Sequence, residues 1–402
     1  MHPLSEALAL WYEHNGRDLP WRAAPDAYRV WLSEVILQQT TVKQGTDYYL
    51  RFLERFPTVE ALAAASEDEV LRLWQGLGYY TRARNLYKAS RQVVERGGFP
   101  TDFKGLRTLA GVGDYTAAAI ASIAFGEPCA VVDGNVYRVL SRHFGIDTPI
   151  DTPAGKRTFA ALAHEVLDKR HPARHNQAMM DFGATLCTPR APRCPDCPVA
   201  ASCLALAEGR VEDLPVKARR IKPTEVRMDY VLVHTPTGLY LRQRGKKGIW
   251  AGLWEIPETL TSRTPSRIPS LSPSLSPSGL PAAPCHPSPV REGEVTPANG
   301  EINRPNVLSP SLTGEGWQSS EGSFDGERLG ERLGLELGLW EGLIGTFTHH
   351  LTHRTILCRA TAVAVEEGTE LPGYTFVRWD DLDRYALPRL IENIIEKWKK
   401  KN

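Results

Sequence analysis

The chain lacks the features that place a protein across a membrane or outside the cell. None of its 402 residues belongs to an unbroken apolar run of about 18 or more, the length that crosses a bilayer. The first residues, MHPLSEALALWYEHNGRDLPW, contain no basic segment followed by an uninterrupted apolar run, so no secretory signal is expected. We therefore expect a cytoplasmic, monomeric protein without a membrane partner.

Cysteine is scarce, and so is net charge. The chain has 7 cysteines, an odd number, and four of them crowd between Cys187 and Cys203, unlike the disulfide framework of a secreted protein. A formal net charge of +1 neither requires nor excludes nucleic acid, because a basic face can be balanced by acidic residues elsewhere. The cysteines instead favour metal or cluster ligation in a reducing compartment.

The hydrophobic pattern divides the chain into two parts. Residues 1–210 carry apolar side chains at helical spacing, as in VWLSEVILQQTTV, which predicts an all-helical domain. From residue 226 the pattern alternates, as in VRMDYVLVHT and GLYLRQR with a hairpin turn at 236–238, which predicts a mixed α/β domain over 226–396. Residues 211–225, basic and proline-bearing, are an expected linker. A Ser/Pro/Gly-rich stretch at about 259–324 predicts a disordered insertion in the second domain.

A glycine-rich turn stands between two expected helices. Gly111-Val112-Gly113 follows a short helical stretch and precedes an alanine-rich helix that should start near Asp114. Glycines let the backbone approach a ligand, and the exposed amides at a helix N-terminus suit an anionic oxygen such as a DNA phosphate. From these residues alone, a turn that only packs two helices remains equally open.

Four cysteines have the spacing C-x6-C-x2-C-x5-C, which places four thiolates on one compact loop able to surround a metal centre. From the spacing alone, both zinc and an iron–sulfur cluster remain open. The ligands would be Cys187, Cys194, Cys197 and Cys203.

Two segments together carry a family resemblance. LAGVGDYTA resembles the helix-hairpin-helix of the endonuclease III superfamily of DNA glycosylases, and VVDGNVYRVL at 131–140 resembles that superfamily's catalytic aspartate segment. The resemblance covers nearly all of residues 4–210. The cysteine pattern is similar to the 4Fe-4S loop of endonuclease III and MutY-type enzymes, which implies a 4Fe-4S cluster at the four cysteines.

Two carboxylates fit the chemistry that this family implies. A glycosylase needs a proton donor for the departing purine and a negative group near the sugar cation. Glu34 lies on an apolar helix face, where desolvation would raise its pKa, and Asp133 follows a buried apolar stretch. Read alone, each is more often a helix cap or a solvated side chain. SEVILQQT resembles the acid motif of MutY-type enzymes, which implies that Glu34 protonates adenine and that Asp133, with Asn135 in its segment, stabilises the sugar cation and assists the attacking water.

One position separates base removal from strand cleavage. Endonuclease III-type enzymes that cut the strand through a Schiff base carry a lysine in the second half of the hairpin, whereas this chain has Tyr115 there. Without the amine that route is closed. The resemblance therefore implies a monofunctional glycosylase with Tyr115 near the sugar.

Further residues are implied to contact the DNA. The segment RDLPWR resembles the adenine pocket of MutY-type enzymes, and Asp181 stands where that family usually has glutamate, which puts one adenine hydrogen bond in question. Two loops, QQT and LGYY, resemble the family's duplex-probing loops, with Arg82, Arg84 and Lys88 meeting phosphates; otherwise their tyrosines are core residues. The predicted DNA-binding residues in this part of the chain are Arg17, Trp21, Arg22, Gln38, Gln39, Tyr79, Tyr80, Gly111, Gly113 and Asp181.

The second domain looks like the MutT-like (Nudix-fold) domain with which MutY-type enzymes read 8-oxoguanine. Its ERLGERLGLELG stretch lacks the paired glutamates that hydrolase metal binding needs, so no nucleotide hydrolysis is expected. Leu351-Thr352-His353 aligns with a Phe-Ser-His loop of the family that contacts the oxidised guanine. Thr352 keeps the hydroxyl, whereas Leu351 removes an aromatic ring.

We therefore expect a base-excision repair enzyme that hydrolyses the N-glycosidic bond of adenine mispaired with 8-oxoguanine or guanine in double-stranded DNA. A pyrimidine-lesion or thymine-mismatch glycosylase would share the hairpin, the aspartate and the cluster, but Tyr115, Glu34 and the second domain argue against it. A non-catalytic damage-binding protein would require Glu34 or Asp133 to be misplaced. A nucleotide hydrolase is disfavoured by the incomplete metal-binding box.

Overall fold

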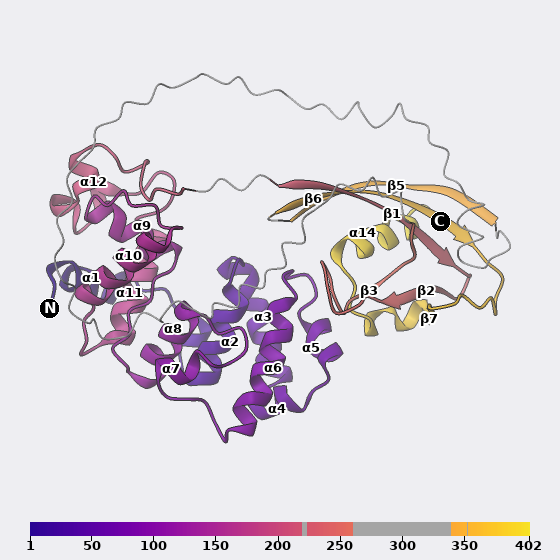
Figure 1. The fold of residues 1–402 in the computed structure, drawn as a ribbon, viewed down its shortest axis with the longest axis horizontal. Coiled ribbons are helices and arrows are strands. Elements are labelled where there is room, and N and C mark those ends of the chain that lie inside the picture. Colours follow the sequence, from indigo (N-terminus) through magenta and orange to yellow (C-terminus); the bar gives the residue numbers. More distant parts are fainter. Residues whose placement is uncertain (219–222, 260–338, 352) are drawn as a thin grey trace.

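The computed structural model describes residues 1–218, 223–259, 339–351 and 353–402, which form two lobes (Figure 1). The helical lobe comprises residues 3–207, and the sheet lobe comprises residues 224–259 and 339–399. Most of the predicted insertion at about 259–324, the ERLGERLGLELG stretch and Thr352 lie outside the described residues. No described helix is long and apolar enough to cross a membrane.

The helical lobe confirms the all-helical prediction for the first part of the chain. Its elements are α1 (Pro3–Asn15), η1 (Pro20–Arg22), α2 (Ala27–Leu37), α3 (Val42–Arg55), α4 (Val59–Ala64), α5 (Glu67–Leu73), α6 (Thr81–Glu95), α7 (Phe103–Leu106), α8 (Asp114–Phe125), α9 (Gly134–His143), α10 (Pro153–Val166), α11 (Pro172–Thr185), η2 (Cys194–Asp196), η3 (Ala200–Ser202) and α12 (Leu204–Ala207).

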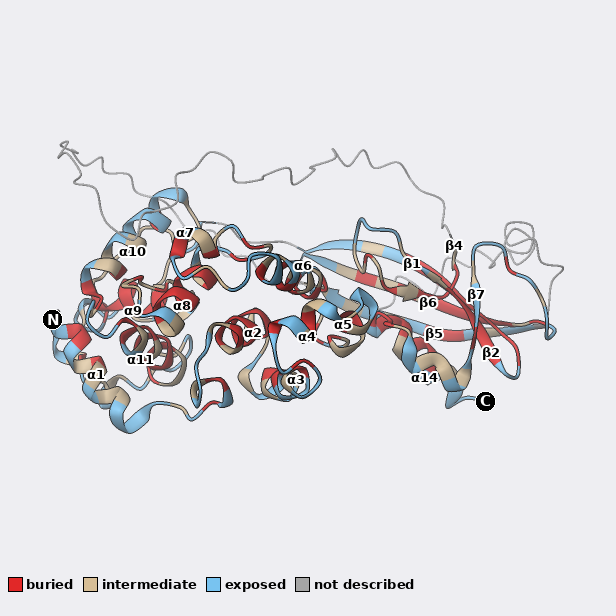
Figure 2. Ribbon diagram, turned by 90° about the horizontal axis from the view of Figure 1, so that it is seen from below, coloured by how far each residue is buried: buried red, intermediate tan, exposed pale blue. Residues whose placement is uncertain are grey.

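Helix α2 runs through the centre of this lobe. Its N-terminus is capped by Asp26, whose carboxylate accepts a hydrogen bond of 2.7 Å from the backbone N–H of Arg29. Every residue from Tyr28 to Ile36 is buried except Arg29, because α3, α6, α8 and η1 all pack against this helix (Figure 2). A polar side chain in this helix is therefore withdrawn from water.

The sheet lobe is a mixed sheet of the strands β1 (Thr224–His234), β2 (Gly238–Gln243), β3 (Trp254–Glu255), β4 (Glu258–Thr259), β5 (Leu339–Leu351), β6 (Arg354–Ala364) and β7 (Thr375–Arg378). Strands β5 and β6 form an antiparallel hairpin, and β6 runs parallel to β1. A short segment, η5 (Trp379–Arg384), leads to helix α14 (Arg389–Lys399), whose Ile391, Ile394 and Ile395 pack on the sheet. These elements form a second core, while Leu253 and Ala386 of this lobe pack into the core of the helical lobe.

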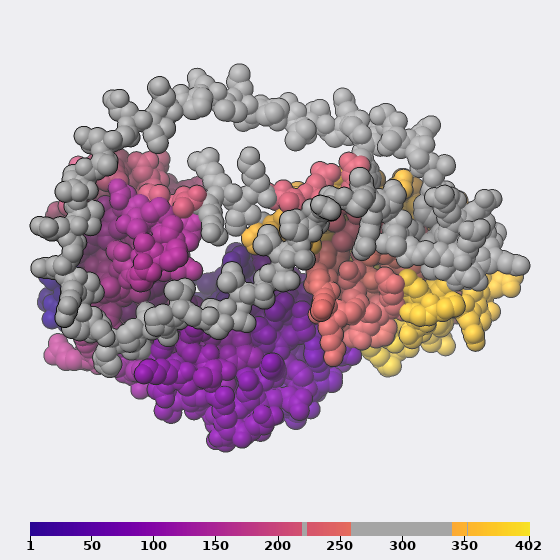
Figure 3. Space-filling model, viewed as in Figure 1, coloured from indigo at the N-terminus to yellow at the C-terminus, as the bar shows by residue number. Residues whose placement is uncertain are grey.

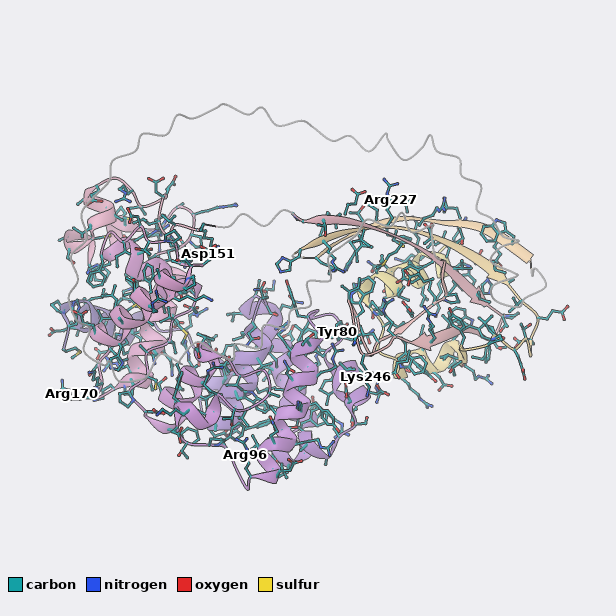
Figure 4. The ribbon with its side chains drawn as sticks, viewed as in Figure 1. Tyr80, Arg96, Asp151, Arg170, Arg227 and Lys246 are labelled. Atoms are coloured by element: carbon teal, nitrogen blue, oxygen red, sulfur yellow. The ribbon has the colours of Figure 1, made fainter. Side chains whose placement is uncertain are left out.

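Besides these apolar contacts, the lobes share polar contacts beside the segment that joins α5 to α6. The amide of Gln75 donates to Glu392 of α14, and Arg84 donates to the carbonyl oxygen of Ala251. The hydroxyl of Tyr80 lies 3.5 Å from the carbonyl oxygen of Leu387. Figure 3 shows the purple helices meeting the salmon strands here, and Figure 4 places Tyr80 at this junction.

Candidate active site

Glu34 supplies the most perturbed carboxyl group of the helical lobe. It lies on α2, and its side chain is only 9% exposed. Burial raises its pKa to about 7, because an apolar environment penalises the charged form. The hydroxyl of Tyr115 and the charge of Arg22 act in the opposite direction, while the carboxylate of Asp133 adds to the increase. Glu34 is therefore poised to give up a proton near neutral pH.

Two further candidate residues converge on Glu34. Tyr115, in the first turn of α8, hydrogen-bonds with the Glu34 carboxyl, and its hydroxyl also lies 3.4 Å from Sδ of Met180. Asp133 interacts electrostatically with both of them. The structure thus brings Glu34, Tyr115 and Asp133 together from three separate elements.

Asp133 is the N-cap of α9. Its Oδ1 accepts a hydrogen bond of 2.8 Å from the backbone N–H of Val136, and its Oδ2 accepts one of 2.8 Å from Nδ2 of Asn135. Burial raises the pKa of Asp133, although these two donors and the charge of Arg138 oppose the increase. Asp133 is therefore a helix cap, one of the alternatives for this residue, and it also interacts with Glu34. One carboxylate oxygen caps α9, while the other is oriented by the side chain of Asn135.

Sequence reasoning missed two residues that hold this aspartate segment. Arg138 donates to the carbonyl oxygens of Asn135 (2.8 Å) and Cys187 (2.6 Å), which ties α9 to the start of the cysteine loop. Asn176 of α11 accepts a hydrogen bond from the N–H of Val131 (3.2 Å) and donates to the carbonyl oxygen of Cys129 (2.7 Å). Arg138 lies three residues after Asn135 on one helix face, a signal that could have found it. Asn176 left no such signal.

Arg17 and Arg22 both bind Asp181, which is fully buried on α11. Arg22 reaches it with two N–H groups at 2.8 and 2.9 Å. Burial acts to raise the pKa of Asp181, but the hydrogen bonds from Arg22 and Arg17 outweigh it and hold the pKa below its usual value. Trp21 is also buried and packs edge-on against Tyr49, so the predicted adenine-pocket segment is anchored in the core.

The two predicted duplex-probing loops are tied together by Arg82. Its guanidinium donates to the carbonyl oxygens of Val35 and Ile36 near the end of α2 and to those of Leu77 and Gly78. Because Arg82 is buried in these contacts, it does not present its charge to a phosphate. The prediction of a phosphate contact is corrected at this residue.

The exposed residues of these loops are Gln39 and Tyr79. Both have positive φ, +59° and +49°, which costs free energy for residues other than glycine. Tyr79 is 47% exposed, whereas Tyr80 is buried in the contact between the lobes. Gln38 instead turns inward, and its amide lies 3.3 Å from Oγ1 of Thr116. The structure therefore leaves Gln39 and Tyr79 as the residues of this group that are open to a partner.

The hairpin glycines have different surroundings. Gly111 has φ +73°, and a Cβ at this position would lie 2.6 Å from Cβ of Asn85, so the helical packing requires glycine. Gly113 is the N-cap of α8 and makes no side-chain cap hydrogen bond. A Cβ added to Gly113 would have no atom within 4 Å. The free amides of α8 are therefore open at Gly113, where an anion would approach.

The predicted cluster ligands all have half-buried free thiols on the loop after α11. Nη1 of Arg142 lies 3.4 Å from Sγ of Cys187, and this cation suits an anionic thiolate centre. Within the described ranges, no group of three or more His, Cys, Asp or Glu side chains is arranged to hold a metal ion. The four thiols, with the guanidinium of Arg142 beside one of them, are donors of the type that an iron–sulfur cluster requires.

The sheet lobe presents a cavity of about 620 Å³ to the helical lobe. Tyr79 lines it from one side, and Trp250, His349 and His353 line it from the other. Trp250 has φ +55°, and its ring packs edge-on against His349 at 5.7 Å. Tyr79 and the predicted reading loop at His353 therefore border a common cavity.

The chain is similar to known DNA glycosylases. Residues 32–163 match the family described as HhH-GPD superfamily base excision DNA repair protein. The human adenine DNA glycosylase is 38% identical over 307 residues, covering 62% of this chain and 56% of the human protein. The adenine DNA glycosylase of Buchnera aphidicola subsp. Schizaphis graminum is 34% identical over 260 residues, covering 64% of this chain and 75% of that protein. A solved thermostable thymine-DNA glycosylase is 28% identical with a TM-score of 0.48, covering 51% of this chain and 95% of that one.

The extent of these matches differs among the relatives. The chain spans little more than half the length of the human relative, but three quarters of the Buchnera one. The family match at 32–163 includes Glu34, Tyr115 and Asp133. The chain therefore belongs to the adenine DNA glycosylases, within the HhH-GPD superfamily of base excision DNA repair proteins.

Proposed function

We propose that the protein is a monofunctional glycosylase that hydrolyses the N-glycosidic bond of adenine mispaired with 8-oxoguanine or guanine in double-stranded DNA. The observation that carries the proposal is the convergence of a protonatable Glu34 with Tyr115 and Asp133 in the lobe that matches the family. The names of the relatives support adenine as the base that leaves.

Glu34, Asp133 and Tyr115 have different roles in the proposed hydrolysis. The Glu34 carboxyl gives its proton to the adenine base, which makes the base a better leaving group. The Asp133 carboxylate, oriented by Asn135, faces the positive charge that develops on the sugar and accepts a proton from the attacking water. Tyr115 hydrogen-bonds with Glu34 and offers no amine, so no Schiff base forms and the strand stays intact.

Tyr79 and the hairpin are proposed to hold the duplex. Tyr79 is exposed and fixed at a positive φ, which suits a ring that enters the gap beside a flipped base. The open amides at Gly113 would bind a backbone phosphate.

The sheet lobe is proposed to be a MutT-like domain that reads the base opposite adenine. The cavity of about 620 Å³ that Tyr79 shares with Trp250 and His353 supports this role, since it joins the intercalating residue to the predicted reading loop. The discrimination between 8-oxoguanine and guanine would then be made across this cavity.

The cysteine loop is proposed to hold a 4Fe-4S cluster through Cys187, Cys194, Cys197 and Cys203. When bound, the cluster would link the four cysteines and so fix the fold of this loop. Arg138 bonds both to this loop, at Cys187, and to Asn135, which orients Asp133. An ordered loop would therefore help to hold Asp133 in its orientation. Arg142 would stabilise the anionic centre.

The proposal is tested by single-turnover excision on a duplex with one adenine opposite 8-oxoguanine, beside A·G, A·T and T·G duplexes. We expect adenine release from the two mispairs alone, a strand that breaks only after alkali, and no release by Glu34→Gln. Glu54→Gln, an exposed glutamate on α3, is the matched control and should keep the wild-type rate. Release of thymine would assign a different glycosylase, and no release from cluster-loaded protein would favour a damage-binding protein.

A further inference from the structure

The carboxylate of Asp181 is saturated by arginine. Its Oδ1 accepts from Nε of Arg17 (2.9 Å), Nη2 of Arg17 (2.5 Å) and Nη2 of Arg22 (2.9 Å). Its Oδ2 accepts from the backbone N–H of Arg17 (2.9 Å) and Nη1 of Arg22 (2.8 Å). A carboxylate has about four acceptor sites, so these donors occupy it fully. No oxygen of Asp181 is left for a base, contrary to the expected adenine contact.

The arginine pair also connects the protein surface to the acid. Arg17 and Arg22 line an open cavity of about 550 Å³ together with Tyr12 and Gln177, whose side chains hydrogen-bond at 2.9 Å. The guanidinium of Arg22 lies 5.8 Å from the centre of the Tyr12 ring, and its charge acts on Glu34. Asp181 is thus the anion that holds Arg22 at this cavity, where the charge of Arg22 acts on Glu34.

We propose that Asp181 is a positioning residue for the acid: it holds Arg17 and Arg22 as a pair and offsets their charge, so that Glu34 keeps its proton. The inference rests on the proposed function, since it assigns Glu34 as the proton donor. An uncompensated Arg22 guanidinium would favour the ionised form of Glu34 and remove the proton that the leaving base needs.

The charged and titratable neighbours of Glu34 come from several elements. Arg22 of η1 favours the carboxylate form, and so does the hydrogen bond from Tyr115 of α8. Asp133, at the start of α9, disfavours it. From α6, Arg82 reaches the carbonyl oxygens of Val35 and Ile36 rather than the carboxyl group. From α3, Tyr49 packs against Trp21, and no group of this helix is among those that act on Glu34. Arg22 is therefore the cation whose compensation matters.

The test is the pH profile of single-turnover adenine excision by the cluster-loaded chain of 402 residues. The alkaline half-point is the pH at which the excision rate has fallen to half of its maximum on the alkaline side of the profile. For Asp181→Asn we expect this half-point to move to lower pH by roughly one unit. Asp181→Glu keeps the charge and should leave the half-point in place, even if the longer side chain slows the reaction. The double variant Asp181→Asn with Arg22→Gln removes the uncompensated cation beside Glu34 and should move the half-point back.

Arg22→Gln keeps the proposal falsifiable if Asp181→Asn does not fold. Removing the cation beside Glu34 should move the alkaline half-point to higher pH, the opposite direction. A residue that only packs would lower the rate and leave the half-point unchanged, so an unmoved profile in a folded Asp181→Asn, or in Arg22→Gln, overturns the inference. Failure of the wild-type protein to release adenine would instead overturn the proposed function.

Discussion

Nδ2 of Asn135 donates a hydrogen bond of 2.8 Å to Oδ2 of Asp133, while the carbonyl oxygen of the same Asn135 side chain accepts one of 2.8 Å from Arg138. The asparagine therefore cannot rotate without breaking two bonds, and it holds the aspartate in one orientation. The other aspartate oxygen is engaged by the backbone of α9. The orientation of Asp133 thus depends on a side chain two residues away.

Asn135→Ala should slow single-turnover adenine excision about tenfold, because the lost hydrogen bond frees the aspartate to rotate. The unfolding free energy should fall by only about 1 kcal/mol, since the backbone cap of α9 remains. Asn15→Ala, at the exposed end of α1, is the control. An unchanged excision rate in a folded Asn135→Ala would show that Asp133 needs no such support.

Glu34→Gln should stabilise the protein above pH 7. The folded pKa of Glu34 is raised to about 7, so its contribution to stability is fully present below the unfolded pKa and is lost as pH rises through about 7. Removing the ionisable group should therefore raise the unfolding free energy at pH 8 to 9, by roughly 3 kcal/mol at most, and change it little at pH 5. Thermal unfolding across this pH range measures the difference. Parallel curves for wild type and variant would contradict the buried, protonated state of Glu34.

Arg82→Lys should lower the unfolding free energy by roughly 2 to 4 kcal/mol, because an ammonium group cannot span the carbonyl oxygens that the guanidinium fork reaches. Urea unfolding measures the loss. Arg91→Lys, an exposed position on the same helix, should cost little. If the two substitutions cost the same, Arg82 does not join α2 to the loop at 77–78.

Alanine at the two hairpin glycines should separate folding from DNA binding. Gly111→Ala places a Cβ 2.6 Å from Asn85 at a positive φ and should destabilise the fold by roughly 1 to 3 kcal/mol. Gly113→Ala meets open space and should fold normally, yet bind duplex DNA more weakly, because the methyl group stands where a phosphate approaches. Fluorescence anisotropy and thermal unfolding report the two effects. Unaltered DNA affinity of Gly113→Ala would exclude a phosphate at this site.

Cys203→Ser should lower the iron and sulfide content of the purified protein and the order of the loop after α11, because one of the four ligands is gone. Cys358→Ser is the matched control, since this thiol is buried in the sheet lobe far along the chain from the loop. Iron and sulfide analysis checks the outcome. Equal loss in both variants, or zinc in place of iron, would overturn the cluster assignment.

Local pattern determined much of what lies along the chain. The alanine-rich helix begins at Asp114 as expected, and the strands β1 and β2 end and begin around the turn at 236–238. Glu34, Tyr115 and Asp133, which the structure brings together, were each singled out by a motif that resembles a known family. The bounds of helices and strands depend on residues close in sequence, and the site residues stand in motifs whose place in the fold is implied by the family resemblance.

Only the tertiary structure decided which of two similar neighbours is exposed. Tyr79 and Tyr80 are adjacent, yet Tyr80 is buried because its partner Leu387 comes from the other lobe, 307 positions later. Asp181, whose adenine hydrogen bond the sequence had put in question, has both oxygens occupied for the same reason, since Arg17 lies 164 positions earlier. Burial and hydrogen-bond saturation depend on what packs against a side chain from distant parts of the chain. Local sequence periodicity does not show such packing. The sequence by itself therefore determined the helices, the strands and the reactive motifs, whereas the tertiary structure decided which polar groups remain free to react.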